Sequence, residues 1–231
     1  MIITFSNVPS RGPILLSTIR SALAKCSDPG SLSIRVLVDG LDTAHLAPEI
    51  LSNARIQVLP CAPQDVPRIF RITFNHLRAL TLVGGGSDPF GLVCEDDLQF
   101  ARGWDKRCLD TARALNLPMT VLSLCSAHDL GFFEPPRCGA MQFKDPRRFY
   151  GHQAMLWSKD AAKLCADQLR AKMQIPWGST EPTWVIDGAT RTFCAENGVP
   201  VWATNPSLVK HVGYTSAWES VNMIVTQRFE E

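Results

Sequence analysis

An apolar run that ends in three consecutive carboxylates constrains the fold of this chain more than any other stretch of it. Residues 90–100 read FGLVCEDDLQF, and a turn rich in glycine, residues 84–89, comes before them. Short apolar runs bounded by turn residues are typical of buried strands in α/β sheets. Open α/β sheets bind ligands outside the carboxyl ends of their strands. The segment therefore predicts a buried strand whose acidic end faces a ligand site.

The three carboxylates themselves indicate a metal. Adjacent like charges repel, most strongly where water is scarce, and a divalent cation offsets that repulsion. Both Mg²⁺ and Mn²⁺ prefer oxygen ligands. Successive side chains of an extended segment point to opposite sides, so we expect Glu95 and Asp97 to share one side and Asp96 to face the other. A solvated acidic turn is the alternative interpretation.

The rest of the chain alternates apolar strands and helical stretches, which predicts an α/β fold. The predicted strands are residues 2–5, 33–39, 55–60, 90–94, 119–124, 154–157 and 199–202, and the predicted helices are residues 14–25, 67–83, 103–115, 161–173 and 183–197. The 231 residues, 45% of them hydrophobic, suffice for one well-packed domain and would be few for two. We expect a single domain over residues 1–231.

Charge and cysteine usage exclude several classes of protein. A formal net charge of +1 argues against a strongly basic nucleic-acid binder and against an acidic disordered chain. No signal peptide and no run of 18 apolar residues is found, so we expect no transmembrane segment. The eight cysteines form no C-x-x-C pair and predict reduced, mostly buried thiols of a cytoplasmic protein.

Several segments resemble the GT-A glycosyltransferases. The triplet Glu95-Asp96-Asp97 is similar to the metal-binding acidic motif of these enzymes, often called DxD, with Glu in the first position. Residues 150–162 (YGHQAMLWSKDAA) resemble a segment of the lipopolysaccharide-type family 25 enzymes, and residues 206–213 (PSLVKHVG) resemble a C-terminal segment of related families. The resemblance implies a GT-A (Rossmann-like) α/β/α sandwich with a mostly parallel central sheet. It also implies a divalent metal, Mn²⁺ or Mg²⁺, and a nucleoside-diphosphate sugar such as a UDP-sugar as the donor.

The resemblance assigns roles to individual residues. The metal ligands would be Asp97, Glu95 and His211. The donor would be bound within residues 1–100, by Asp39 after the second strand, Arg11 in the loop after the first strand, Arg71 and Asn75 on the helix before the acid triplet, and Glu95 and Asp96. Each assignment has a structural alternative: Asp39 as a turn former, His211 as a structural histidine, and Arg71 with Asn75 as part of a solvated helix face.

The predicted reaction transfers a sugar to an acceptor hydroxyl with inversion, which requires a carboxylate base. Asp187 is the first candidate, because it opens a predicted helix after the loop 176–183, where similar enzymes place that base. Glu181 is the second candidate. An N-cap role is the alternative for Asp187. Residues 101–231 would then form the acceptor-binding half.

The acceptor is expected to contact a long loop over residues 131–152. This loop interleaves basic and aromatic side chains, namely Lys144, Arg147 and Arg148 with Phe143, Phe149 and Tyr150. The basic side chains could bind phosphates and the aromatic rings could stack on a ligand. Such a loop suits an anionic saccharide such as a lipooligosaccharide, which is our first choice of acceptor, and a hydroxymethylated pyrimidine base in DNA, which is our second. A solvated basic loop is the structural alternative.

Two other classes of function stay open. A nucleotidyltransferase shares the fold and the acidic pair but usually carries a glycine-rich, basic loop after the first strand, and residues 6–13 match that loop poorly. A non-catalytic binding module with the same fold is the second class. The sequence has no G-x-S-x-G, P-loop or G-x-G-x-x-G motif, which argues against serine hydrolases, P-loop phosphotransferases and dinucleotide enzymes.

Overall fold

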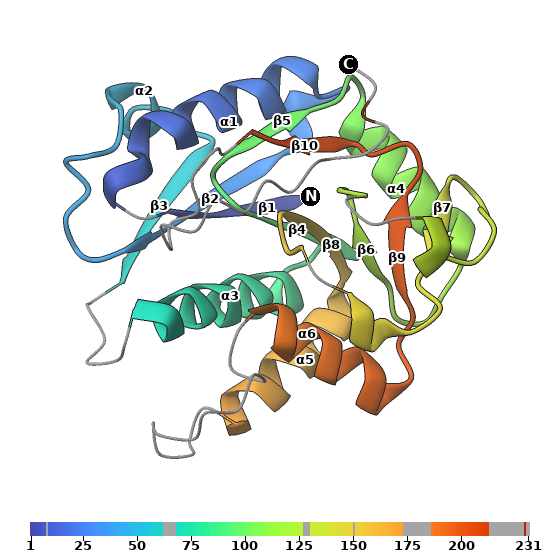
Figure 1. The fold of residues 1–231 in the computed structure, drawn as a ribbon. Helices are drawn as coiled ribbons and strands as arrows, with labels where there is room; N and C mark the ends of the chain where they lie inside the picture. Colours follow the sequence, from blue (N-terminus) through green and yellow to red (C-terminus); the bar gives the residue numbers. More distant parts are fainter. Residues whose placement is uncertain are drawn as a thin grey trace.

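The fold is built around one eight-stranded sheet with the strand order β3-β2-β1-β4-β8-β6-β9-β7 (Figure 1). The computed structural model describes residues 1–7, 9–61, 68–126, 130–149, 151–172, 186–212 and 229. The strands of this sheet are β1 (Ile2–Asn7), β2 (Ser33–Asp39), β3 (Ile56–Cys61), β4 (Phe90–Cys94), β6 (Val121–Ser123), β7 (Ala140–Gln142), β8 (Ala154–Ser158) and β9 (Val201–Thr204).

Most strands of the sheet run in the same direction. β3, β2, β1 and β4 pair in parallel, and β6 pairs in parallel with β9. β8 is antiparallel to both β4 and β6, and β7 is antiparallel to β9. The sheet is therefore mostly parallel, with β8 and β7 reversed, and the acid triplet after β4 leaves the sheet at the edge where β1 and β2 also end.

Helices cover both faces of the sheet, because each presents one apolar stripe to it (Figure 1). The helices are α1 (Gly12–Lys25), α2 (Pro48–Leu51), α3 (Arg68–Gly85), α4 (Trp104–Leu115), α5 (Lys159–Lys172) and α6 (Ile186–Asn197). One apolar cluster joins the sheet to α1, α2 and α4, and the other joins it to α3, α5 and α6. The predicted α/β/α sandwich is confirmed.

The structure corrects the prediction in two regions. No strand was predicted after residue 202, but β10 (Val209–His211) pairs antiparallel with β5 (Leu98–Phe100) in a separate two-stranded sheet. The predicted uninterrupted loop over 131–152 contains β7 and a 3-10 helix, η4 (Pro146–Arg148). These elements are three residues long, which is too short for hydrophobic periodicity to reveal.

All eight cysteines lie in the described part of the chain, and none of them forms a disulfide. Five of the thiols are buried, namely those of Cys94, Cys108, Cys125, Cys165 and Cys194, which confirms the prediction of mostly buried cysteines. Among the described residues, no helix has both the length and the apolar character that crossing a membrane requires.

Two neighbouring glycines of α3 provide a test of how tightly the helices pack. A Cβ on Gly84 would lie 2.8 Å from Cα and 2.9 Å from the backbone N of Lys163 on α5, whereas a Cβ on Gly85 would meet no atom within 4 Å. We expect Gly84→Ala to lower the free energy of unfolding by about 1–3 kcal/mol, because the backbone of α5 would have to shift. Gly85→Ala should change it by less than about 1 kcal/mol. Urea unfolding of both variants measures the difference, and equal effects would contradict the close backbone contact.

Candidate active site

The acid triplet follows β4 at the carboxyl edge of the sheet. The backbone N–H of Glu95 donates to the carbonyl of Gln153 at 2.8 Å, which extends the pairing of β4 with the chain before β8 by one residue. Asp96 and Asp97 then turn the chain into β5. Leu92, Val93 and Cys94 are buried, so the apolar part of β4 fixes where the carboxylates emerge. The buried strand with an acidic end is confirmed.

Glu95, Asp97 and His211 form one cluster. Nε2 of His211 lies 2.9 Å from Oδ2 of Asp97 and 3.8 Å from Oε2 of Glu95. The backbone places His211 there, because it is paired with Leu98 in the β5–β10 sheet and because the N–H of Val212 donates to the carbonyl of Asp97 at 2.9 Å. The three predicted metal ligands are thus brought together from two distant parts of the sequence.

The cluster fits a hard divalent cation. One ligand atom from each of the three residues lies within 4.8 Å of the others. Around an octahedral cation with bonds of about 2.1 Å, ligand atoms stand about 3 Å apart when adjacent and about 4.2 Å apart when opposite. Oδ1 of Asp97 is buried and has no hydrogen-bond partner within the described part of the chain, so the site has a carboxylate oxygen left for a ligand.

Asp96 lies outside the cluster of Glu95, Asp97 and His211. Its Oδ2 accepts a hydrogen bond from Nδ2 of Asn7 at 2.9 Å, and its backbone carbonyl accepts one from Oγ1 of Thr18 at 2.7 Å. Asn7 Oδ1 lies in turn 2.9 Å from Nε2 of His45. Asp96 is 3% exposed, and its bonds hold the end of β1 and the middle of α1 against the acid triplet.

Arg11 bridges two of the carboxylates. Its Nε lies 3.2 Å from Oδ1 of Asp96, and its Nη2 forms an ion pair with Oδ2 of Asp97. Arg11 is the last residue of the 3-10 helix η1 (Pro9–Arg11) and directly precedes α1. The guanidinium therefore offsets part of the negative charge that the triplet gathers.

Burial and neighbouring charges shift the pKa values of these groups in different directions. Burial raises the pKa of Asp96 to about 6, because the loss of hydration outweighs the attraction of Arg11 and the hydrogen bond from Asn7. Burial also works to raise the pKa of Asp97, but His211 and Arg11 outweigh it and hold this pKa below its ordinary value. For His211, burial works to lower the pKa, and the bond to Asp97 outweighs it and raises the pKa.

The other predicted donor residues lie at the same edge of the sheet or on α3. Asp39 ends β2, and its Oδ2 lies 3.9 Å from Nη1 of Arg71. Asn75 is buried, and its Oδ1 accepts a hydrogen bond from Nη1 of Arg78 at 3.1 Å. Arg78 also donates to the carbonyl of Leu59 at the end of β3. The structure thus joins Asp39 to Arg71 and ties Asn75 to the strand beside them.

No family model and no curated protein sequence matches the chain. The structure, however, is similar to the crystal structure of the galactosyltransferase LgtC in complex with donor and acceptor sugar analogues. That match has a TM-score of 0.53 and 14% sequence identity, and it covers 94% of this chain and 89% of LgtC. The chain has the GT-A fold. A second match, to an active-site mutant of LgtC, has a TM-score of 0.48 and 13% identity over the same shares of the two chains.

Within the GT-A fold, the helix that carries Asp187 is anchored close to the strand beside β4. Asp187 is the second residue of α6, and Thr190 lies one turn further along. Oγ1 of Thr190 is 2.5 Å from Nε2 of His152, which directly precedes Gln153, the backbone partner of Glu95. The side chain of Asp187 lies outside the described residues, as does all of Glu181.

The anchor consists of buried histidines, which gives folding a pH dependence. His152 packs edge-on against His76 at 4.8 Å between ring centroids, and burial lowers the pKa of His152 to about 3. Below pH 6.5 the imidazole of His152 takes up a proton in the unfolded chain but stays neutral in the folded chain. The free energy of unfolding is therefore highest above pH 6.5, as far as His152 is concerned, and it decreases as the pH falls.

We expect the free energy of unfolding to fall less steeply between pH 6 and pH 4 in His152→Gln than in the wild type. The difference in slope should be about 1.4 kcal/mol per pH unit, the value for one proton. Urea unfolding at several pH values measures both slopes, and the comparison isolates His152 because the two proteins share every other titrating group. Parallel curves would contradict a neutral, buried His152.

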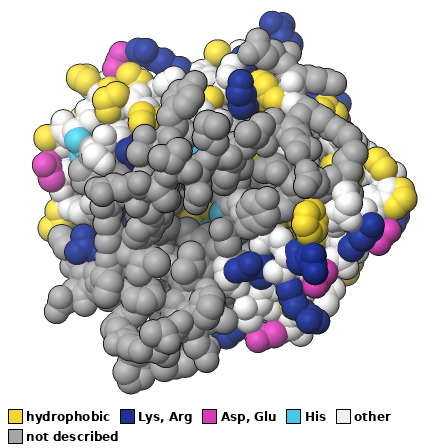
Figure 2. All heavy atoms as spheres, viewed as in Figure 1, with side chains coloured by type: hydrophobic (Ala, Val, Ile, Leu, Met, Phe, Trp, Pro, Cys, Tyr) yellow, Lys and Arg dark blue, Asp and Glu magenta, His cyan; other side chains and the backbone are white. Residues whose placement is uncertain are grey.

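The basic and aromatic segment 143–149 does not form the expected stacking surface. Phe143 and Phe149 are each 1% exposed and pack in the core, so the prediction is wrong for these two rings, and Tyr150 lies outside the described residues. The pattern missed this because basic side chains on a short 3-10 helix can point outward while the flanking aromatic side chains pack inward. Lys144, Arg147 and Arg148 are exposed, and Figure 2 shows Lys and Arg side chains gathered toward the lower right of this face.

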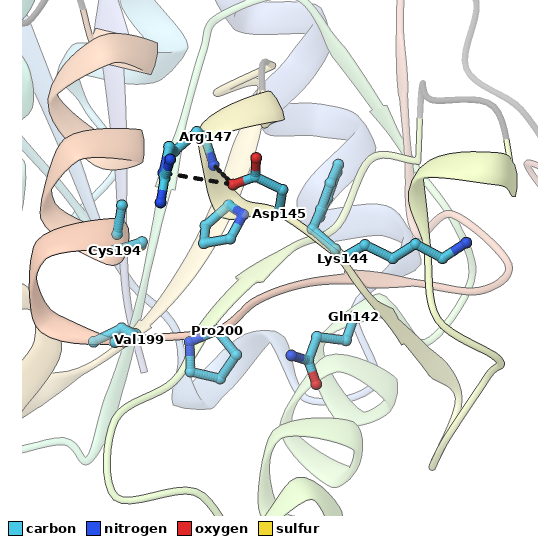
Figure 3. A pocket seen from close by; sticks show the side chains of 11 residues that line it. Gln142, Lys144, Asp145, Arg147, Cys194, Val199 and Pro200 are labelled. Carbon is cyan, nitrogen blue, oxygen red and sulfur yellow. Dashed lines mark hydrogen bonds and ion pairs between the residues drawn. The ribbon is translucent and has the colours of Figure 1, made fainter.

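A pocket of about 440 Å³ lies beside this segment, between Gln142, Arg147, Cys194 and Pro200 (Figure 3). Figure 3 shows Arg147 and Asp145 side by side and Lys144 extending away from them. β9 runs in the same direction as β4, and Pro200 stands just before β9 begins. The pocket is therefore at the amino edge of the sheet, opposite to the acid triplet.

Several contacts of the site were not predicted from the sequence. Asn7, Thr18 and His45 are not part of any motif, and their hydrogen bonds around Asp96 join segments that are far apart in the chain. A polar residue at the end of a buried strand was the only local signal for Asn7. Arg11 was predicted to contact the donor, and no signal indicated its contacts with Asp96 and Asp97.

Proposed function

We propose that the protein is a metal-dependent glycosyltransferase that moves a sugar from a nucleoside-diphosphate sugar to an acceptor hydroxyl. The cluster of Glu95, Asp97 and His211 at the carboxyl end of β4 carries this proposal. In an α/β sheet that edge is where ligands bind, and two carboxylates with an imidazole suit a divalent cation. The GT-A fold, shared with the galactosyltransferase LgtC, supports the same reaction class.

Glu95, Asp97 and His211 would hold Mn²⁺ or Mg²⁺. When bound, such a cation supplies Lewis-acid stabilisation of the charge that builds on a departing diphosphate. The chain's own residues keep this site in place: Asn7 and Thr18 fix Asp96 and the start of β5, and the β5–β10 pairing fixes His211. Such preorganisation removes the cost of arranging charged groups during the reaction.

The nucleotide would lie along the ends of β1 and β2. Asp39 at the end of β2 would accept hydrogen bonds from the nucleotide, and Arg71, whose Nη1 lies 3.9 Å from Oδ2 of Asp39, would supply positive charge to a phosphate. In this proposal residues 1–100 bind the donor and residues 101–231 bind the acceptor. His211 is the metal ligand that comes from the acceptor-binding half. Asn75 would contribute to donor binding, and its side chain is held by Arg78, which also donates to the carbonyl of Leu59 in β3.

Asp187 would take the proton from the acceptor hydroxyl, and the product would have inverted configuration at the transferred sugar. Two observations support this assignment: Asp187 stands in the first turn of α6, and that helix is anchored through Thr190 and His152 next to the backbone partner of Glu95. A carboxylate base in reach of the acceptor is what inversion requires. Glu181 is the second candidate for this role.

We propose a saccharide acceptor, such as a lipooligosaccharide. Support comes from the complex of LgtC with donor and acceptor sugar analogues. The alternative of hydroxymethylated DNA loses its main argument, because the aromatic rings of Phe143 and Phe149 are in the core and cannot stack on an extruded base.

The proposal is tested by incubating the purified protein with a panel of nucleoside-diphosphate sugars and saccharide acceptors, with Mn²⁺ or with EDTA. We expect release of the nucleoside diphosphate and transfer of the sugar in Mn²⁺ only. A parallel arm with hydroxymethylpyrimidine DNA distinguishes the two acceptor classes. Consumption of no donor under any metal condition, or equal consumption in EDTA, would overturn the proposed function.

A further inference from the structure

Arg11 holds an oxygen that a metal at this site would also contact. Oδ2 of Asp97 lies 2.9 Å from Nε2 of His211 and forms the ion pair with Nη2 of Arg11. Nε of the same guanidinium lies 3.2 Å from Oδ1 of Asp96. Arg11 thus offsets one of the three negative charges of the triplet.

This arrangement conflicts with a divalent cation bound by Asp97. The guanidinium does not lose its proton under ordinary conditions, so it cannot relieve the repulsion by becoming neutral. Like charges that share a partly buried carboxylate repel strongly, because little water is present to screen them. A cation that binds Oδ2 of Asp97 therefore competes with the guanidinium for that oxygen.

An exchange of partners by Arg11 needs only its side chain to move, because the backbone around it is held in place. Gly12 packs against the carbonyl of His45, to which an added Cβ would come within 2.2 Å, so the chain after Arg11 is held closely. Thr18 ties α1 to Asp96 and to the N–H of Leu98. The Arg11 side chain itself is 16% exposed, so part of it is in contact with solvent.

We propose that Arg11 exchanges partners: it neutralises Asp96 and Asp97 in the free protein, and it releases Asp97 and binds the diphosphate when the metal and the donor bind. This inference rests on the proposed function. The planar fork of a guanidinium matches phosphate oxygens as well as it matches carboxylates, so the exchange replaces one pair of contacts with another of similar kind.

The exchange makes metal binding and nucleotide binding depend on each other. Metal alone has to displace Arg11 without giving it a new partner, and therefore binds weakly. With the nucleotide present, the guanidinium has phosphate oxygens to bind, and the metal binds more tightly. By thermodynamic linkage, the metal raises the affinity for the nucleotide by the same factor.

The test compares Arg11→Met with the wild type by isothermal titration calorimetry. Mn²⁺ is titrated without nucleotide, and UDP is titrated at saturating Mn²⁺, with GDP used if UDP does not bind to the wild type. We expect Arg11→Met to bind Mn²⁺ at least tenfold more tightly and the nucleotide at least tenfold more weakly. The factor by which the nucleotide raises Mn²⁺ affinity should also fall at least tenfold. A merely structural role of Arg11 would weaken the binding of both ligands.

Arg20→Met is the matched control, since Arg20 is on α1, which directly follows Arg11, and pairs with Glu49 at 2.7 Å on the exposed side. It should bind both ligands like the wild type. Arg11→Gln is the second variant, and circular dichroism melting confirms that each variant is folded.

Mn²⁺ affinity that is unchanged or weaker in both folded Arg11 variants would overturn the exchange. If the wild type still turns over a nucleotide sugar in a metal-dependent way, only the exchange is wrong. If neither the wild type nor any variant binds a nucleotide or turns over a nucleotide sugar, the proposed function fails. In that case, tighter Mn²⁺ binding by both Arg11 variants would still support the competition between Arg11 and the metal for Asp97.

Discussion

Replacing Asp97 with Asn should lower kcat/KM for sugar transfer by about 10³-fold or more, which corresponds to about 4 kcal/mol of transition-state stabilisation. Asp97 contacts both Arg11 and His211, and its Oδ1 is buried without a partner among the described residues. It is therefore the central ligand of the proposed metal site. The amide keeps the shape of the carboxylate, and the fold should therefore persist. The loss should appear in Mn²⁺-dependent turnover and in Mn²⁺ binding together.

Asp110→Asn is the control for this prediction. Asp110 is an exposed carboxylate on α4 that pairs with Lys106 at 2.5 Å, so its replacement should leave turnover unchanged. Initial rates at increasing Mn²⁺ concentration and circular dichroism spectra would be recorded for both variants. Wild-type turnover of Asp97→Asn in the presence of EDTA would rule out the metal model.

Replacing Asp187 with Asn should lower kcat by about 10²- to 10⁴-fold, the range in which a general base contributes. An amide cannot take the proton of the acceptor hydroxyl. Donor binding should change little, because the base acts on the acceptor. The expected signature is therefore a lower kcat with an unchanged dissociation constant for the nucleotide sugar, measured by steady-state rates and by calorimetry.

Glu196→Gln offers a matched control on the same helix. Glu196 lies near the other end of α6 and pairs with Lys172 at 3.4 Å, so this variant should turn over like the wild type. NMR spectra of the product, recorded before the anomers equilibrate, should show inversion. A product with retained configuration, or undiminished turnover by Asp187→Asn, would transfer the role of base to another group.

The parts of this structure that depend on local sequence were predicted well. The buried strand β4 with its acidic end follows from five successive residues of low polarity and the three carboxylates after them, and alternation alone placed Glu95 and Asp97 on one side. The sandwich of helices around a mostly parallel sheet follows from the order of strands and helices along the chain.

The contacts between distant segments were not predictable in the same way. His211 reaches the acid triplet through a pairing of two three-residue strands, and only the family resemblance indicated it. The bonds of Asn7, Thr18 and Arg11 to the triplet depend on how α1 packs on the sheet, which no local pattern encodes. The burial of Phe143 and Phe149 was missed for the same reason, since composition does not show which side of a short element faces the core.

The small β5–β10 sheet has a consequence for how the protein would retain its cation. If β10 detaches, His211 and the bond from Val212 to Asp97 are lost together, while the eight-stranded sheet stays intact. Such local opening costs less free energy than global unfolding. The rate at which a chelator strips the metal would then follow the local opening of β10, whose Val209 has to leave the apolar core, more than the unfolding of the whole sheet. Resistance to heat and resistance to metal loss would thus be separate properties of this chain.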